Sequence, residues 1–426
     1  MNTRYRLAGA LLFLMLSLAS SPVRAVVVGS VGALQSAVDT ANSGGDKTIL
    51  IADGIYDLSG VALSITADGV TIRGVSGNRS AVVLDNHYVA GGTSGIFRIL
   101  ASGVTIADLT LQRPYFHAIH ISPAEGRSTQ NILIRNVHII DPGEQAIKIN
   151  PDNPVSATYT VNNGTIKNCL IELTDAGRTQ LTSDLECYTG GIDGHWAANW
   201  KVQDNVIRGF WCSDGLSEHG IHFWNNSSNI LVERNKIIDC DRGIGFGLGE
   251  DRGSTGGIIR NNMIYHGPDH GYSDVGISLE STPDAQVYNN TVFHAHAYAA
   301  IEYRFITTTG ALIANNLTNR AIDPRDFASG TESHNLTTAQ ASWFVNTSAG
   351  DLHLASVVSS VVDQGMAVPG LTDDFDRGAR PFGAGYDIGA DEYGAGPPPP
   401  PSPPPVVPEG VNLAPVLHLL LDRPGG

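Results

Sequence analysis

The chain has 426 residues and is acidic, with 26 lysines and arginines against 42 aspartates and glutamates and a formal net charge of −16. This balance excludes the basic footprint of a nucleic-acid-binding protein, so we expect no nucleic-acid partner. It also disfavours a polyanionic substrate unless a cation or a local basic group offsets the charge.

Residues 1–25 have the pattern of a secretory signal peptide. Arg4 and Arg6 precede an apolar run over residues 7–18, and Val23 to Ala25 form a small-residue cleavage pattern. The run is too short to span a membrane, and no later segment is apolar enough to do so, so we expect no membrane span. Cleavage removes three arginines and no acid, which moves the formal charge from −16 to −19. We expect a secreted or cell-surface protein that acts as a monomer.

Residues 26–60 are predicted to form an N-terminal cap. A helix is expected over residues 31–42, because Ser30 can cap it and one face carries Leu34, Ala37, Val38 and Ala41. A strand over residues 48–52 and an Asp-Gly turn follow. A short helix covering the first open edge of a sheet prevents edge-to-edge aggregation.

Residues 61–335 contain a repeat with two halves, which recurs every 26–37 residues. One half has a polar residue, in most copies followed two places later by Ile, Leu or Val: Asp108, Asn136, Asn168, Asn205, Asn235, Asn262, Asn290 and Asn316. The other alternates apolar and polar residues after Ala or Gly: Ile119, Ile147, Ile192, Ile221, Ile244, Ile277 and Ile301. A period of this length built from strands indicates a solenoid. We therefore predict an all-β fold, a right-handed parallel β-helix, with the Asn column forming an amide ladder at one bend.

Insertions lengthen three connections, at residues 175–190, 209–219 and 267–275. Loops inserted on one face of a solenoid are where binding usually occurs, so we expect them to wall an open groove on the side of Lys148 and His222. Cys187 and Cys212 lie in neighbouring insertions. They could form a disulfide that links the two loops, or both could be free thiols. Cys169 and Cys240 lie in strand halves and are expected to be buried.

Three segments follow the coils. Residues 336–393 have short strands and Gly-rich turns and are predicted to cap the second end of the β-helix. Residues 394–408 are a Pro-rich linker, which we expect to act as a stiff spacer between the β-helix and the following segment. Residues 409–426 form a tail too short to fold alone.

In each alternating strand the Ile of the repeat and the apolar residue two places later point inward. The residues one and three places after the Ile therefore point outward and form two columns. The first outward column is His120, Lys148, Asp193, His222, Gly245, Ser278 and Glu302. The second is Ser122, Asn150, His195, Trp224, Gly247, Glu280 and Arg304. Lys148, Asp193 and His222 would stand on successive rungs, with His195 beside them. The competing interpretation is an ordinary solvated face of a β-helix.

The opening TILIADGIY, the coils and the ending DIGADEY resemble secreted bacterial pectate-lyase-like β-helix proteins over residues 26–393. In such proteins a similar ending precedes C-terminal anchors. The run from Gly143 to Lys148 also resembles the carboxylate-then-lysine run of polysaccharide lyase family six. The family's paired acids are reduced here to Glu144, and His195 stands where its arginine would be.

β-Elimination of a uronate-containing polysaccharide requires a base for the C5 proton and a group that neutralises the carboxylate. We predict Lys148, His195, His222 and Arg304 as catalytic residues. Lys148 would be the base if nearby groups lower its pKa, Arg304 would neutralise the carboxylate, and His222 or His195 would meet the leaving oxygen. Glu144 and Asp193 are predicted calcium ligands, because calcium prefers oxygen donors, and no other cofactor is expected. The predicted substrate-binding residues are His120, Asn150, Trp196, Trp224, Glu280 and Glu302. Glu218-His219 and Asp269-His270 lie in insertions and are interpreted as rim residues.

Three alternatives to a lyase remain open. A glycoside hydrolase needs two carboxyls about 5–9.5 Å apart, but Asp193 and Glu280 are separated by about 14 Å of rung spacing. Glu280 and Glu302 are closer, although they lie away from the histidines. A C5-epimerase would use the same base and neutralising group as a lyase. A non-enzymatic carbohydrate-binding or adhesive surface protein would tolerate loss of Lys148, His195 and His222.

Overall fold

The computed structural model describes residues 25–91, 95–151, 153, 156–181, 187–270 and 272–396. The predicted signal peptide, apart from Ala25, lies outside the described residues, as do residues 397–426 of the linker and tail. No helix within the described ranges is long and apolar enough to cross a membrane.

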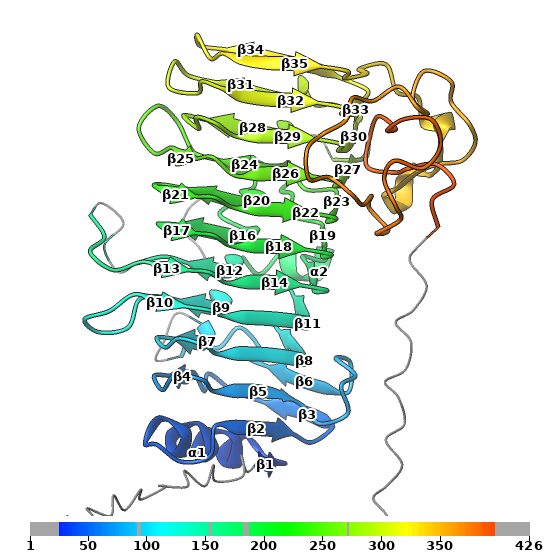
Figure 1. Cartoon of the computed structure of the whole chain (residues 1–426). Coiled ribbons are helices and arrows are strands. Elements are labelled where there is room, and N and C mark those ends of the chain that lie inside the picture. The colour runs from blue at the N-terminus through cyan, green and yellow to red at the C-terminus, as the bar shows by residue number, and fades with distance from the viewer. Residues whose placement is uncertain are drawn as a thin grey trace, which may run out of the picture.

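The chain is a right-handed parallel β-helix, as predicted, in which every coil adds one rung to long parallel sheets (Figure 1). The strands of the ten-stranded sheet are β4 (Leu63–Ile65), β7 (Gly95–Ile99), β9 (His117–Ile121), β12 (Gln145–Ile149), β16 (Gly190–His195), β20 (His219–Trp224), β24 (Arg242–Phe246), β28 (Val275–Glu280), β31 (Ala299–Arg304) and β34 (Ala321–Arg325).

A twenty-stranded sheet forms the rest of most coils, usually as two short strands joined at a bend. Its strands are β1 (Ala25–Val28), β2 (Thr48–Ile51), β3 (Gly54–Asp57), β5 (Thr71–Gly74), β6 (Val82–Asp85), β8 (Thr105–Gln112), β11 (Leu133–Ile140), β14 (Thr165–Lys167), β15 (Leu170–Glu172), β18 (Lys201–Gln203), β19 (Val206–Arg208), β22 (Leu231–Glu233), β23 (Lys236–Ile238), β26 (Ile258–Arg260), β27 (Met263–His266), β29 (Gln286–Tyr288), β30 (Thr291–His294), β32 (Ala311–Ala314), β33 (Leu317–Thr318) and β35 (Gly330–Ser333). A five-stranded sheet fills one corner with β10 (Thr129–Gln130), β13 (Val161–Asn162), β17 (Ala197–Ala198), β21 (Ser227–Ser228) and β25 (Ser254–Thr255).

The predicted isoleucine column is confirmed. Each of its members pairs with the next in parallel register, from Ile119 through Ile147 to Ile301, and all are fully buried. The same register places Lys148 opposite His120 on one side and Asp193 on the other. The two outward columns therefore stack as the alternation predicts.

The asparagine ladder is confirmed for the last five members of the predicted column and wrong for the first three. From Asn205 to Asn335 each amide Nδ2 donates to the Oδ1 of the next coil over 2.9–3.0 Å. Asp108, Asn136 and Asn168 instead have positive φ and belong to an outer column. That outer column continues one residue before each ladder asparagine, at Asp204, Arg234, Asn261, Asn289 and Asn315. The sequence pattern could not separate two adjacent columns that are both rich in asparagine.

The N-terminal helix is confirmed as α1 (Val31–Asn42), with Ser30 accepting from the amide of Ala33. Its apolar face packs into the same core as the first coils. The predicted boundary at residue 61 is wrong, because β1 already pairs with β2, β2 with β5 and β3 with β6. These first rungs lack the polar and isoleucine columns from which the coils were located.

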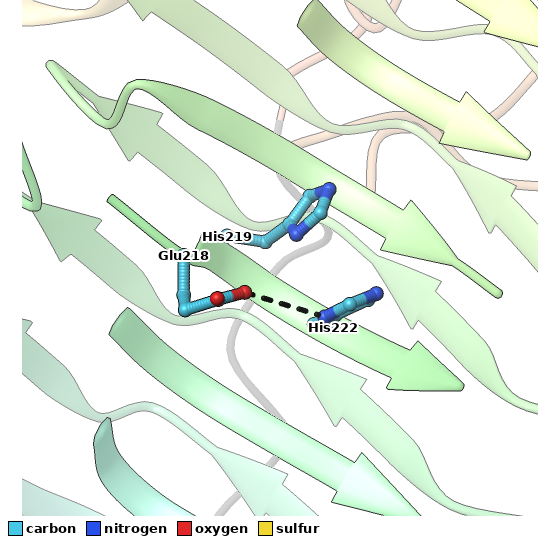
Figure 2. Close-up of side chains that lie close together, drawn as sticks. All are labelled: Glu218, His219 and His222. Carbon is cyan, nitrogen blue, oxygen red and sulfur yellow. Dashed lines mark ion pairs between the residues drawn. The ribbon is translucent and has the colours of Figure 1, made fainter. Parts of the chain in front are cut away.

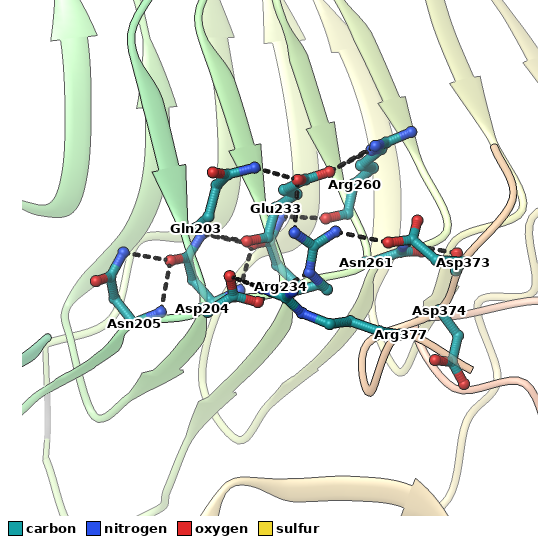
Figure 3. Close-up of polar contacts among 12 residues, drawn as sticks. Gln203, Asp204, Asn205, Glu233, Arg234, Arg260, Asn261, Asp373, Asp374 and Arg377 are labelled. Atoms are coloured by element: carbon teal, nitrogen blue, oxygen red, sulfur yellow. Dashed lines mark hydrogen bonds and ion pairs between the residues drawn. The ribbon is translucent and has the colours of Figure 1, made fainter. Parts of the chain in front are cut away.

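Residues 336–396 lie along the side of the β-helix, not across its end as predicted (Figure 1). They contain η1 (Ala341–Trp343), β36 (Phe344–Asn346), η2 (Thr347–Ala349) and β37 (Asp351–Leu354). The outer column holds them: Asn261, Asn289 and Asn315 donate side-chain hydrogen bonds to backbone carbonyls of this segment. Two ion pairs, Arg234 with Asp373 at 2.8 Å and Arg377 with Asp204 at 2.5 Å, add to this attachment (Figure 3).

His353, a half-buried histidine in this side segment, makes the stability of the segment depend on pH. His353 lies 2.5 Å from Asp351 and 3.0 Å from Asp376. Burial alone would lower its pKa, but hydrogen bonds to Asp376 and Asp351 raise the pKa to about 9 from 6.5. Because the folded pKa exceeds the unfolded one, this stabilisation is complete below about pH 6.5 and is lost as the pH rises through about 9. We expect the melting temperature to fall across this window.

The measurement is thermal unfolding at several pH values for the wild type, His353→Gln and the exposed-residue control His334→Gln. His353→Gln should flatten the decline between pH 6.5 and 9, whereas His334→Gln should leave it unchanged. An equal decline in all three proteins would show that His353 is not responsible.

Candidate functional site

The outward face of the ten-stranded sheet carries a cluster of titratable side chains at β12, β16 and β20. Lys148, Asp193 and His222 lie on successive rungs, and His195 follows two residues after Asp193, as the columns predict. All four are buried, between 1% and 7% exposed. A solvated face would leave such groups in water, so that interpretation is wrong for this part of the sheet.

Lys148 is the centre of this cluster. Its Nζ makes a very short ion pair with Asp193 and donates to the Tyr188 hydroxyl over 3.3 Å. Burial opposes the charge of Lys148, but the adjacent Asp193 carboxylate and Tyr188 raise its pKa above the ordinary value. The expectation that neighbours lower the pKa of Lys148 is therefore wrong, and the group is held as an ammonium.

Asp193 organises the histidine and the tryptophan around it. Its Oδ2 lies 3.0 Å from His195 Nε2, and its Oδ1 accepts from Trp224 Nε1 over 2.7 Å. Burial raises the pKa of Asp193, yet the charges of Lys148 and His195 hold it well below its usual value. His195 Nε2 also lies 3.4 Å from Lys148 Nζ, which only donates. The shorter contact with the carboxylate, which only accepts, favours a proton on Nε2. The Nδ1 of His195 is buried and has no hydrogen-bond partner among the described residues.

His222 contacts groups on its own rung and on both neighbouring rungs. Its Nε2 lies 3.0 Å from the carbonyl oxygen of Gly247, while its Nδ1 lies 3.8 Å from Asp193 and 4.0 Å from Glu218. The ring of His219 stands 4.1 Å from that of His222. Burial lowers the pKa of both imidazoles, so both are neutral near pH 7. The interpretation of His219 as a rim residue is wrong, because it begins β20 and is 5% exposed.

A smaller group spans the rung of Lys148 and the rung before it. His120 Nε2 lies 2.6 Å from Asn150 Oδ1, which brings two predicted substrate-binding residues together. His117 Nε2 lies 3.6 Å from Glu144. Burial lowers the pKa of His117 to about 3 and raises the pKa of Glu144 above its usual value. These four side chains extend the cluster toward β9.

The predicted calcium ligands are engaged in other contacts. Asp193 already meets Lys148, His195 and Trp224, and Glu144 faces His117. An ion on Asp193 would have to displace the Lys148 ammonium. Calcium binding by this pair stays a prediction that the geometry does not favour.

Arg304, Glu280 and Glu302 form a separate group at the far end of the sheet. Arg304 lies 2.8 Å from Asp326, 3.8 Å from Glu302 and 4.0 Å from Glu280. Five rungs separate Lys148 from Glu302 in the register, which is about 24 Å at the usual strand spacing. The structure therefore does not bring the predicted catalytic residues Arg304 and Lys148 together, because alternation places both outward but on distant rungs.

The insertions divide between two sides. Cys187 and Cys212 form a disulfide, and Tyr188 brings its insertion to Lys148. Trp211 instead stacks on His270 with ring centres 4.0 Å apart. These two rings help to line a cleft of about 580 Å³ beside the ends of β15, β19 and β23, together with the start of α2 (Asp175–Arg178) and Ser348 and Ala349. The groove over Lys148 stays a prediction, since residues 182–186 and 271 lie outside the described ranges.

The local backbone explains where Trp196 lies. Tyr188 and His219 are residues of the cluster that the repeat pattern did not identify. Trp196 follows β16 at a positive-φ bend and is half-buried, so it lies beyond the outward column. Tyr188 directly follows Cys187. Its position near Lys148 could have been predicted only if the Cys187–Cys212 disulfide had been known. His219 precedes the Gly220 of the repeat at the start of β20, and its ring lies beside that of His222. Cys169 and Cys240 are buried as predicted.

The fold and this face define a parallel β-helix protein with a buried cluster of titratable groups on one sheet. Residues 170–336 are similar to the family described as "Periplasmic copper-binding protein (NosD)", a match over less than half of the chain. No curated protein sequence matches.

Several solved structures share the general architecture. An alginate lyase from Paenibacillus sp. str. FPU-7 is 17% identical, with a TM-score of 0.49 over 72% of this chain and 97% of that one. PfbA, a surface adhesin of Streptococcus pneumoniae, is 14% identical, with a TM-score of 0.45 over 71% and 85%. The pectate lyase Pel9A is 12% identical, with a TM-score of 0.43 over 83% and 90%.

Proposed function

We propose that this chain is a polysaccharide lyase that cleaves a uronate-containing polymer by β-elimination on the outward face of β12, β16 and β20. The observation that carries the proposal is the buried contact set of Lys148, Asp193, His195 and Tyr188. This set combines the Lys148 ammonium, the His195 imidazole, whose Nδ1 has no hydrogen-bond partner among the described residues, and the Tyr188 phenol. These are the groups that β-elimination requires.

The roles follow from the hydrogen bonds. The contact with Asp193 favours the proton of His195 on Nε2, which leaves the Nδ1 lone pair to take the C5 proton of the uronate once the buried ring turns toward the substrate. Lys148 donates to Tyr188, which leaves the phenolic proton for the departing O4. The C5–H and C4–O4 bonds break, a C4=C5 double bond forms, and the Lys148 ammonium stabilises the negative charge on the uronate carboxylate. Lys148 is thus the electrostatic group, and His195 is the base.

We place Trp224, His120 and Asn150 in substrate binding. The Trp224 ring is half-exposed and anchored through Nε1 to Asp193, and an anchored ring of this kind stacks on a sugar face. His120, one rung from Lys148, and Asn150, directly after β12, offer polar groups. A polymer lying along the stacked rungs reaches both.

We place the protein outside the cytoplasm. The Cys187–Cys212 disulfide fits an oxidising compartment, and the predicted signal peptide fits export. The family similar to residues 170–336 is described as periplasmic. A polymer-degrading enzyme must be exported in order to meet its substrate.

The alternatives differ in what they require. A hydrolase needs two free carboxyls, but Asp193 is engaged by Lys148 and Glu302 by Arg325. A C5-epimerase uses the same base and cation and returns a proton to C5 without losing O4. A carbohydrate-binding protein needs no base. Product chemistry distinguishes these outcomes.

The test is a panel of uronate polysaccharides incubated with the mature protein, with ultraviolet absorbance of the unsaturated product and reducing ends measured together. A lyase raises both signals, a hydrolase only reducing ends, and an epimerase neither, although NMR then reports altered C5 configuration. His195→Gln should lower the rate about 10²–10⁴-fold, the usual share of one general base. His334→Gln is the exposed control. Full activity of His195→Gln would remove His195 from the chemistry.

A further inference from the structure

Glu218, His219 and His222 form a compact group at the start of β20 (Figure 2). One potential ligand atom from each lies within 4.8 Å of the others. The two imidazoles are 5% and 1% exposed, whereas Glu218 is half-buried at the edge of the group. The three side chains turn toward one another, and His222 Nδ1 faces the Glu218 carboxylate.

Two buried nitrogens in this group lack a hydrogen bond. Nδ1 of His219 and Nδ1 of His222 have no partner among the described residues. An unsatisfied buried polar atom is costly and requires an explanation. For His222 the carbonyl of Gly247 accepts from Nε2, so the unpartnered Nδ1 carries a lone pair rather than a proton.

Neighbouring rungs hold both rings in place. The carbonyl of Gly247 orients His222, and Ser278 Oγ lies 3.2 Å from His219 Nε2. Gly245 makes room for His219, because a Cβ at this position would lie 2.5 Å from His219 Nε2. Metal-binding imidazoles are commonly oriented in this way, through a hydrogen bond from the ring nitrogen that does not bind the metal.

We propose that Glu218, His219 and His222 bind a divalent transition-metal ion of the zinc class. Two imidazole nitrogens and one carboxylate oxygen form a ligand set typical of such ions, whereas calcium takes oxygen ligands alone. A tetrahedral ion with bonds of about 2 Å holds its ligands roughly 3.3 Å apart. Glu218 Oε2 lies 4.0 Å from His222 Nδ1, so metal binding requires the half-buried carboxylate to move closer. The fourth position is left for water or substrate.

The site differs from the calcium site expected on Glu144 and Asp193 in both ligands and metal. It borders the proposed lyase centre, because His222 Nδ1 lies 3.8 Å from Asp193. The proposal does not require lyase activity. A chain that binds zinc but cleaves no polysaccharide would support this inference and contradict the proposed function.

The experiment uses untagged mature protein, freed of metal with a chelator and titrated with zinc by calorimetry, with bound metal counted by elemental analysis. We expect one zinc ion per chain. His222→Gln and His219→Gln should weaken binding more than about 100-fold, beyond the loss from removing only an outer partner. Copper(II), in a second arm, should bind more tightly than zinc at the same residues. Calcium should not bind there.

Two variants separate loss of the site from loss of the fold. Glu218→Gln removes the half-buried ligand, and it should weaken zinc binding at least 10-fold while leaving the melting temperature of the metal-free protein unchanged. His138→Gln is the matched control, because His138 faces Glu172 at 2.7 Å on another sheet. The proposal is overturned if neither zinc nor copper binds stoichiometrically, or if Glu218→Gln and His222→Gln bind as the wild type does.

Discussion

Lys148→Ala is expected to abolish polysaccharide cleavage and to lower the free energy of unfolding by about 3–5 kcal/mol, the usual cost of breaking a buried ion pair. Lys148 is 6% exposed and Asp193 is 5% exposed. Without the ammonium, the Asp193 carboxylate stays buried with no full positive charge to compensate it. Activity falls for a separate reason, because the group that stabilises the negative substrate is lost.

Two comparisons separate these effects, with stability measured by denaturant unfolding. Lys201→Ala changes an exposed lysine on β18 and should leave stability within about 0.5 kcal/mol. The double variant Lys148→Met/Asp193→Leu removes both charges and should regain much of the lost stability without activity. If Lys148→Ala unfolds like the wild type, Lys148 does not compensate a buried Asp193. If it retains activity, Lys148 is not the electrostatic group.

Asn235→Leu is expected to lower the free energy of unfolding by at least about 3 kcal/mol, because several buried polar groups lose partners worth about 1–3 kcal/mol each. Asn235 is fully buried. Its Nδ2 donates to Val202 O and to Asn262 Oδ1, at 2.9 and 3.0 Å. Its Oδ1 accepts from the backbone and side-chain nitrogens of Asn205, at 3.1 and 2.9 Å. Leucine has a similar size but satisfies none of these groups.

The ladder supplies its own control. Asn335 is the last member and is half-buried, with only Asn316 as a ladder partner. Asn335→Leu should therefore destabilise the protein less than Asn235→Leu in the same chemical unfolding assay. Equal midpoints for Asn235→Leu and the wild type would show that the amide ladder contributes nothing to stability.

Periodicity alone determined the fold and the register of the ten-stranded sheet. One residue in two points outward in a strand, and stacked rungs align equivalent positions, so the isoleucines locate each coil. For this reason the repeat by itself places Lys148, Asp193 and His222 on successive rungs. The pattern fails at the first rungs, β2 and β3, which lack both marker columns.

Burial, distance and the partners of each side chain were decided only by the tertiary structure. Alternation places both Lys148 and Arg304 on the outward face. It does not show that loops bury Lys148 or that the two residues lie several rungs apart. Asn168 and Asn205 look equivalent in sequence, yet one residue of offset at the bend puts only Asn205 in the ladder. The rings of His219 and His222 stand 4.1 Å apart, a contact that the alternation of the strand does not predict. These properties depend on contacts between coils, which no single repeat encodes.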